Sequence, residues 1–155
     1  MKTWTRIGVR LRVLPAASIA LMLVAVARVM SAATPPGVGD PAPNFTLNTL
    51  DNKPLELKEL LKDGTVLLVV LRGWPGYQCP ICTRQVHDFI THADTFVAQK
   101  AQVLFVYPGP AKNLKAHAQE FLKDANWPKQ YRFVIDPDYK FTLTYHGDVP
   151  MQRKG

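Results

Sequence analysis

From residue 45 onward, apolar residues alternate between the spacing of strands and the spacing of helices. Residues 45–47 and 54–57 are short strand-like segments, and the polar residues 51–53 between them favour a turn. Together these segments predict a β-hairpin. Residues 58–62 predict one helical turn, which Asp63-Gly64 ends.

Three apolar runs follow, at residues 65–71 (TVLLVVL), 103–107 (VLFVY) and 133–135. The first is continuous and rich in β-branched residues, which predicts a strand buried on both faces. Helical periodicity separates the runs. One helix is predicted from Cys82 onward, a second over 111–125 and a short third over 139–145. The inward stripe of the first helix contains Val86, Phe89, Ile90, Ala93, Phe96 and Val97. Strands that alternate with helices predict an α/β fold with a parallel sheet.

The first 33 residues predict a secretory signal. A basic stretch over 1–12 precedes an apolar run over 13–27, and small residues at 31–33 suit cleavage. An uncleaved anchor is the alternative, although about 20 apolar residues are needed to span a bilayer and this run is shorter. We therefore expect an exported protein, periplasmic or extracellular, that contacts a membrane only if the leader is retained. Residues 34–43, rich in Pro and Gly, predict a linker to one domain over 44–155.

The formal net charge of +7 is located mainly in this leader. Residues 1–33 carry 5 basic and no acidic side chains, and the rest of the chain carries 14 basic and 12 acidic ones. We find no cluster of Lys and Arg with interleaved aromatic residues, so the sequence does not favour nucleic-acid binding.

The two cysteines of the chain, Cys79 and Cys82, form a C-P-I-C box between a predicted strand and a predicted helix. Backbone N–H groups and the helix dipole favour an anion at a helix start, and the thiolate is the reactive form of cysteine. Arg72 and Arg84 are nearby cations. Two intervening residues let the sulfurs approach closely enough to form a disulfide, and this box next to a βαβ pattern indicates redox chemistry. A structural disulfide and a zinc site are the alternatives, and two cysteines supply only half of a zinc set.

The segment 39–47 (GDPAPNFTL), the hydrophobic strand and the cysteine box resemble the alkyl hydroperoxide reductase/thiol-specific antioxidant (AhpC/TSA) family. The resemblance covers roughly residues 38–146. It implies a thioredoxin-like fold with an N-terminal β-hairpin, a peroxiredoxin-like antioxidant activity on hydroperoxides and no cofactor. It also implies an external thiol reductant, such as a thioredoxin-like donor.

The resemblance assigns the two cysteines in two opposite ways. Peroxiredoxins carry P-x-x-x-T-x-x-C, which places Pro75 on the proline, Cys79 on the threonine and Cys82 on the peroxidatic position. Thioredoxin-like oxidoreductases instead attack with the first cysteine, here Cys79, and resolve with the second. In both cases Cys79 and Cys82 cycle between dithiol and disulfide. Thr83, in the first turn after Cys82, is a further candidate to hydrogen-bond a sulfur.

Two features depart from the family pattern. Peroxiredoxins place an Arg near the cysteine from later in the chain, and Tyr139 occupies one common site of that Arg. The family also continues past a Y-G-V segment, resembled by 145–149, with two more strands and a helix, which we expect to be missing here.

Four functions therefore remain open. The first is a peroxiredoxin-like enzyme that reduces hydroperoxides, and the second is an oxidoreductase that acts on protein disulfides. The third is a module that binds a soft metal such as Cu(I) through two thiolates. The last is an inactive, truncated product.

Overall fold

The computed structural model describes residues 35–146. The predicted leader, whether signal peptide or anchor, lies outside the described residues, as does the chain after residue 146. Residues 35–43 contain neither helix nor strand, as expected for a linker. Within 35–146, no helix has the length and apolar character needed to cross a membrane.

The predicted hairpin and the helical turn after it are confirmed. β1 (Thr46–Thr49) pairs antiparallel with β2 (Pro54–Glu56), and the turn between them places Asn52 at a φ of +59°. α2 (Leu57–Leu60) follows directly and continues as a 3-10 turn that ends before Gly64. At Gly64, with a φ of +138°, the chain reverses into the next strand.

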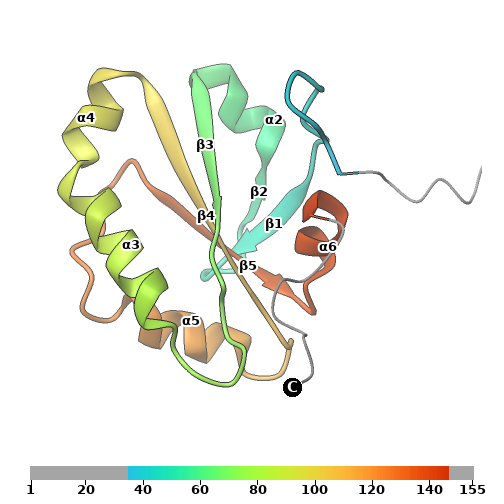
Figure 1. The fold of residues 1–155 in the computed structure, drawn as a ribbon, viewed down its shortest axis with the longest axis vertical. Coiled ribbons are helices and arrows are strands. Elements are labelled where there is room, and N and C mark those ends of the chain that lie inside the picture. Colours follow the sequence, from blue (N-terminus) through green and yellow to red (C-terminus); the bar gives the residue numbers. More distant parts are fainter. Residues whose placement is uncertain (1–34, 147–155) are drawn as a thin grey trace, which may run out of the picture. The chain divides into compact units, whose positions relative to one another are not determined.

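Three longer strands form the rest of one mixed sheet (Figure 1). β3 (Thr65–Val70), β4 (Ala101–Gly109) and β5 (Arg132–Pro137) are parallel to one another. The hairpin joins them through antiparallel pairing of β1 with β5, which gives the order β2-β1-β5-β4-β3. β4 is therefore the central strand of the parallel part, and seven of its nine residues are buried.

The helix that begins at the cysteine box is shorter than predicted. α3 (Pro80–Thr91) ends at His92, and α4 (Ala93–Ala98) starts immediately afterwards. His92 leaves helical geometry with φ −101° and ψ 19°. The single inward stripe predicted through Val97 is wrong at its end, because the change of direction leaves Val97 50% exposed.

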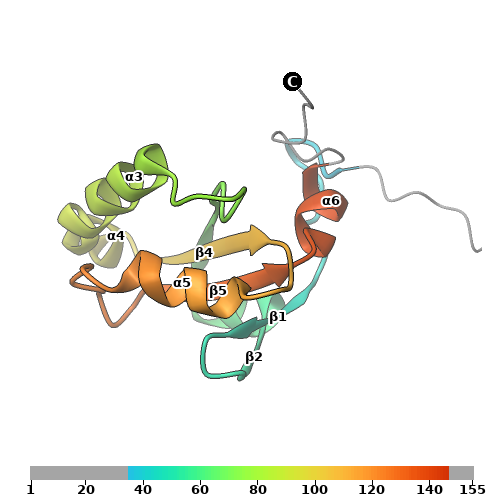
Figure 2. The ribbon, with the colours of Figure 1, turned by 90° about the horizontal axis from the view of Figure 1, so that it is seen from below.

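The two remaining helices lie where the sequence predicts them, with shifted ends. α5 (Leu114–Leu122) is shorter than the predicted 111–125, and α6 (Lys140–His146) follows β5 after a two-residue turn. Figure 2 shows α6 standing apart from α3 and α4, beside the ends of β1 and β5. The two groups of helices therefore contribute to different parts of the core.

Alternating residues of the strands serve two hydrophobic clusters. One lies between the sheet and helices α3 to α5 and includes Phe105, Tyr107 and both cysteines. The other contains Leu104 and Val106 and packs against Phe45 of the hairpin region, α2 and α6. The period-2 alternation of β4 thus places one face of the strand toward each cluster.

β3 corrects one prediction. Its sequence TVLLVV predicts a strand buried on both faces, yet β3 lies at the edge of the sheet among the described residues. Leu67 and Val70 are each 37% exposed, while Val69 is buried beneath the helices. An apolar run shows that a strand belongs to the core, but its place in the sheet depends on tertiary pairing.

Candidate active site

The loop of residues 71–78 carries the chain from β3 to the cysteines and is fixed against the end of β4. The backbone N–H of Leu71 donates to the carbonyl oxygen of Val106 at 2.9 Å, and that of Trp74 donates to Pro108 at 2.9 Å. Gly73 lies between them with a φ of +70°, and a Cβ there would stand 1.7 Å from the Pro108 carbonyl oxygen. Only glycine allows the loop to approach β4 this closely.

Cys79 is the residue that caps the N-terminus of α3. Its backbone is extended (φ −82°, ψ 111°), and its Sγ accepts a hydrogen bond from the backbone N–H of Cys82 at 3.4 Å. Pro80 occupies the first turn, where a missing N–H costs nothing. The sulfur thus takes the place that a Ser, Thr or Asp oxygen usually takes at a helix start.

The environment of Cys79 favours its thiolate. Burial is the largest single effect and raises the pKa of this thiol. Hydrogen bonds from the Cys82 thiol, from the backbone N–H groups of Cys82 and Ile81, and from Arg72 act in the opposite direction. They outweigh burial, so the pKa of Cys79 lies below its ordinary value of 9.0.

Cys82 has the opposite character. It lies one turn into α3, is 6% exposed, and belongs to the core cluster under the helices. Burial, followed by the hydrogen bond with the Cys79 thiol, raises the pKa of Cys82 to about 11. The two sulfurs therefore differ: the pKa of Cys79 is lowered, whereas that of Cys82 is raised and this thiol stays protonated at neutral pH.

Arg72 is the predicted cation that the structure brings to the sulfurs. It favours the thiolate of Cys79, and its guanidinium carbon lies 5.0 Å from the centre of the Tyr77 ring. Its Nε is buried and has no hydrogen-bond partner among the residues that the structure describes. A buried unpaired donor is costly, so an anion that forms beside Arg72 gains a partner that is already desolvated.

For the other predicted site residues, the structure gives no contact with either sulfur. Thr83 donates from Oγ1 to the backbone oxygen of Cys79 at 3.2 Å, which steadies the turn without contacting a sulfur. Arg84 is exposed on α3, and Pro75 is half-buried in the loop. Tyr139, at a position where the family pattern has an Arg, donates from its hydroxyl to the backbone oxygen of Trp74 at 3.4 Å.

Sequence reasoning missed a polar network behind the loop. The buried hydroxyl of Tyr107 donates to Gln78 Oε1 at 2.9 Å, and Gln78 Nε2 donates to the His117 carbonyl oxygen at 2.8 Å. The rings of Trp74 and His117 stack with centroids 3.6 Å apart and an angle of 4° between their planes. One signal was available: Tyr107 follows four apolar residues near the carboxyl end of a buried strand, the end where the sites of parallel sheets lie.

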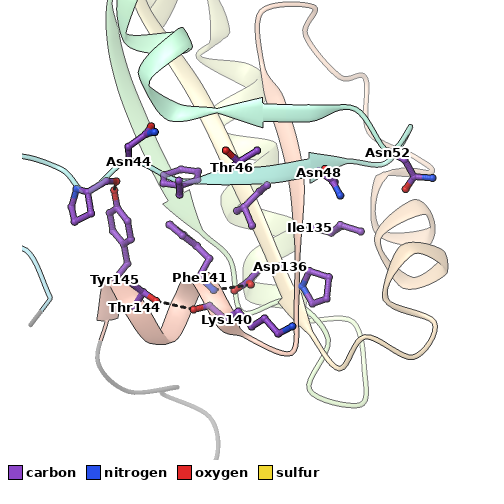
Figure 3. A pocket seen from close by; sticks show the side chains of 14 residues that line it. Asn44, Thr46, Asn48, Asn52, Ile135, Asp136, Lys140, Phe141, Thr144 and Tyr145 are labelled. Atoms are coloured by element: carbon purple, nitrogen blue, oxygen red, sulfur yellow. Dashed lines mark hydrogen bonds between the residues drawn. The ribbon is translucent and has the colours of Figure 1, made fainter. Parts of the chain in front are cut away.

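Hollows open on the described part of the protein. A groove of about 610 Å³ runs between α3 and α5, and Gln78 and Thr83 form its end nearest the cysteines. A second hollow of about 650 Å³ lies between β1 and α6, away from the cysteine loop, and is shown in Figure 3. Within residues 35–146, no group of three or more His, Cys, Asp or Glu side chains is arranged to hold a metal ion.

A parallel sheet that carries two cysteines, two residues apart, to the first turn of a helix defines a thioredoxin-like protein. The chain belongs to the AhpC/TSA family, whose model matches residues 38–151. The fold and the family expected from the sequence are thereby confirmed. Membership supports a thiol-dependent oxidoreductase. No curated protein matches the chain significantly.

Solved structures agree with this fold at low sequence identity. A hypothetical protein from Sinorhizobium meliloti matches with a TM-score of 0.55 and 14% identity, over 67% of this chain and 56% of that one. The peroxidoxin BcpB from Mycobacterium tuberculosis matches with a TM-score of 0.53 and 23% identity, over 69% of this chain and 64% of that one. A secreted M. tuberculosis disulfide oxidoreductase homologous to E. coli DsbE matches with a TM-score of 0.51 and 18% identity, over 66% of this chain and 68% of that one. The matched region thus spans less than two thirds of the first two structures.

Proposed function

We propose that the protein is a dithiol–disulfide oxidoreductase in which Cys79 attacks and Cys82 resolves. The observation that carries this proposal is the place of Cys79 at the N-terminus of α3, where its Sγ accepts from the Cys82 N–H at 3.4 Å. The pKa directions agree with it: that of Cys79 is lowered, and that of Cys82 is raised to about 11. An attacking thiol needs a thiolate population at ambient pH. A resolving thiol stays protonated and unreactive until a mixed disulfide has formed.

The reaction proceeds in two exchanges. The Cys79 thiolate attacks one sulfur of the substrate disulfide, forms a mixed disulfide and releases the other substrate sulfur as a thiolate. Cys82 then gives up its proton, attacks Cys79 Sγ and forms the Cys79–Cys82 disulfide, while the second substrate sulfur leaves as a thiol. The protein has thus passed two electrons and the Cys82 proton to the substrate, and the thiolate product takes a second proton from water. An external thiol reductant then reduces the Cys79–Cys82 disulfide and is itself oxidised to a disulfide.

Arg72 has a supporting role in this scheme. Its guanidinium already favours the Cys79 thiolate. The buried Nε, which has no partner among the described residues, is available to donate to an anionic sulfur. Export through the predicted leader, with a protein disulfide as substrate and a thioredoxin-like donor as partner, completes the proposal.

Reduction of hydroperoxides is the second candidate function. Membership of the AhpC/TSA family and the seven-residue spacing from Pro75 to Cys82 favour it. In the family pattern, however, Cys82 holds the peroxidatic position, and a thiol with a pKa of about 11 has few thiolates at neutral pH. The geometry therefore favours disulfide exchange over peroxide reduction.

Stopped-flow fluorescence on the reduced protein tests both functions, because Trp74 lies beside the cysteines. We would mix the parent, Cys79→Ser and Cys82→Ser proteins with a disulfide-bonded peptide and, separately, with hydrogen peroxide. We expect Cys79→Ser to lose reaction with the disulfide, and Cys82→Ser to accumulate a mixed disulfide visible by mass spectrometry. Fast peroxide oxidation that is lost only in Cys82→Ser would instead establish a peroxidase and overturn the assignment of the attacking sulfur.

A further inference from the structure

Gln78, the residue immediately before Cys79, uses both ends of its side-chain amide. Oε1 accepts from the Tyr107 hydroxyl at 2.9 Å, while Nε2 donates to the His117 carbonyl oxygen at 2.8 Å and lies 3.3 Å from a Glu120 carboxylate oxygen. One side chain thus joins the cysteine loop to the central strand β4 and to helix α5.

The orientation of this amide is determined by its partners. A backbone carbonyl can only accept a hydrogen bond, so Nε2 must face His117 and Oε1 must face Tyr107. The Tyr107 hydroxyl must then donate. Burial raises the pKa of Tyr107 well above its ordinary value, so the hydroxyl keeps its proton at every pH at which the enzyme would work. Titration of Tyr107 therefore does not break its hydrogen bond to Gln78 in that pH range.

The start of the loop has its own attachment to the same helix. The ring of His117 stacks on Trp74, while the carbonyl of His117 accepts from Gln78. A single residue of α5 thus contacts the loop four residues apart, at Trp74 and at Gln78. Between these two positions the loop carries Gly76, which has a φ of +112° and no atom within 4 Å of where its Cβ would be. Gly76 adds no packing of its own, so the attachments of Trp74 and Gln78 to α5 help to hold the shape of the loop.

The position of the Cys79 sulfur depends on this shape. Its Sγ accepts from the Cys82 N–H at 3.4 Å, and the contribution of a helix terminus falls off within the first turn. A small outward movement of residue 78 would carry the sulfur away from the N–H groups that favour its thiolate. Cys79 is only 4% exposed, so the same movement would also change its access to reagents.

Building on the proposed function, we propose that Gln78 is a positioning residue for Cys79. By holding the loop between Tyr107 and His117, it keeps the Cys79 sulfur at the N-terminus of α3 and so sets its reactivity. Gln78 itself contacts neither sulfur nor substrate in this assignment. Its removal should therefore alter the pH dependence of Cys79 and leave the fold intact.

The test is the pH profile of alkylation by iodoacetamide, measured on the reduced protein. Cleavage after Arg72 and Arg84 gives a peptide of residues 73–84 that contains both cysteines, and fragmentation mass spectrometry assigns the label to each. For Gln78→Ala we expect the midpoint of the Cys79 profile to rise by about half a pH unit, which lowers the rate at neutral pH roughly threefold. The matched control is Gln119→Ala, an exposed glutamine on α5, which should leave the profile unchanged.

Tyr107→Phe provides a second variant that keeps the buried ring and removes only the hydrogen bond to Gln78. It should shift the midpoint of the Cys79 alkylation profile in the same direction by a smaller amount. If Gln78→Ala does not melt cooperatively, Tyr107→Phe is the variant that tests the positioning role. Unchanged Cys79 profiles in the folded variants would overturn the positioning role. Labelling of Cys82 before Cys79 in the parent protein would instead overturn the proposed function, so the two failures are distinguishable.

Discussion

Replacement of Gly73 by alanine should be the most damaging small change in the cysteine loop. The added Cβ would stand 1.7 Å from the carbonyl oxygen and 2.7 Å from the carbonyl carbon of Pro108. These are backbone atoms of the central strand β4, which is held by β3 on one side and β5 on the other. The strand cannot yield, so the loop must move outward by more than 1 Å to reach ordinary contact.

The cost can be worked out from the contacts that this movement breaks. An alanine at a φ of +70° carries backbone strain of about 1–2 kcal/mol. The hydrogen bond from the Trp74 N–H to Pro108 contributes about 1 kcal/mol. Loss of the stack of Trp74 on His117 adds a further 0.5–1.5 kcal/mol or so. We therefore expect Gly73→Ala to lower the free energy of unfolding by about 3–4 kcal/mol.

Gly76→Ala is the matched control, because it lies in the same loop. Its φ of +112° also strains an alanine, but no atom lies within 4 Å of the added Cβ. Strain alone, of about 1–3 kcal/mol, is expected there. Urea unfolding of both reduced variants measures the difference, and Trp74 fluorescence should change only in Gly73→Ala. If the two substitutions cost the same, the contact with Pro108 does not hold the loop and the reasoning fails.

Two further predictions concern buried ionisable groups. Burial raises the pKa of Cys82 from 9.0 to about 11, so the stability that its protonated thiol contributes is complete below pH 9 and is lost as the pH rises through 11. In urea unfolding, the free energy of unfolding of the reduced parent should therefore fall by about 2 kcal/mol more than that of Cys82→Ala by pH 11. An equal fall in the two proteins would contradict this. Asp136, 0% exposed, accepts a hydrogen bond from the backbone N–H of Phe141 (Figure 3) and two more from the N–H and hydroxyl of Thr142, all in α6. Asp136→Asn replaces one acceptor by a donor, so it should lower the free energy of unfolding in urea by about 1–3 kcal/mol. The alkylation rate of Cys79 should stay unchanged, and a slower rate would show that α6 is coupled to the cysteines.

Much of the fold followed from local patterns. The change between period 2 and period 3.6 located the hairpin, the strands and the helices to within a few residues, because each element buries one side of itself. The same patterns failed where the chain changes direction. Nothing in the apolar spacing marks the break at His92, since the residues on both sides keep a helical period.

The site was predictable in part for a similar reason. Cys79, Cys82 and Arg72 are close together in the sequence, and a strand followed by a helix is enough to bring them together in space. Gln78, Tyr107 and His117 come from a loop, a strand and a helix that are far apart in the chain. The place of Tyr107 at a strand end was the one signal, and no spacing in the sequence connects it with Gln78 and His117.

The sequence by itself determined that this is an α/β protein of the AhpC/TSA family with a redox-type cysteine pair at a helix start, because local periodicity and motif spacing are properties of the chain. It left open which sulfur attacks, because both interpretations use the same two cysteines in opposite roles. Tertiary structure gave the two sulfurs different surroundings, and the proposed roles rest on that difference. Both are buried in one core cluster, but only Cys79 lies where the N–H groups of Cys82 and Ile81 at the helix start and Arg72 all act to lower its pKa. Thiol reactivity depends on burial and on neighbours from other elements, and these exist only after the chain has folded.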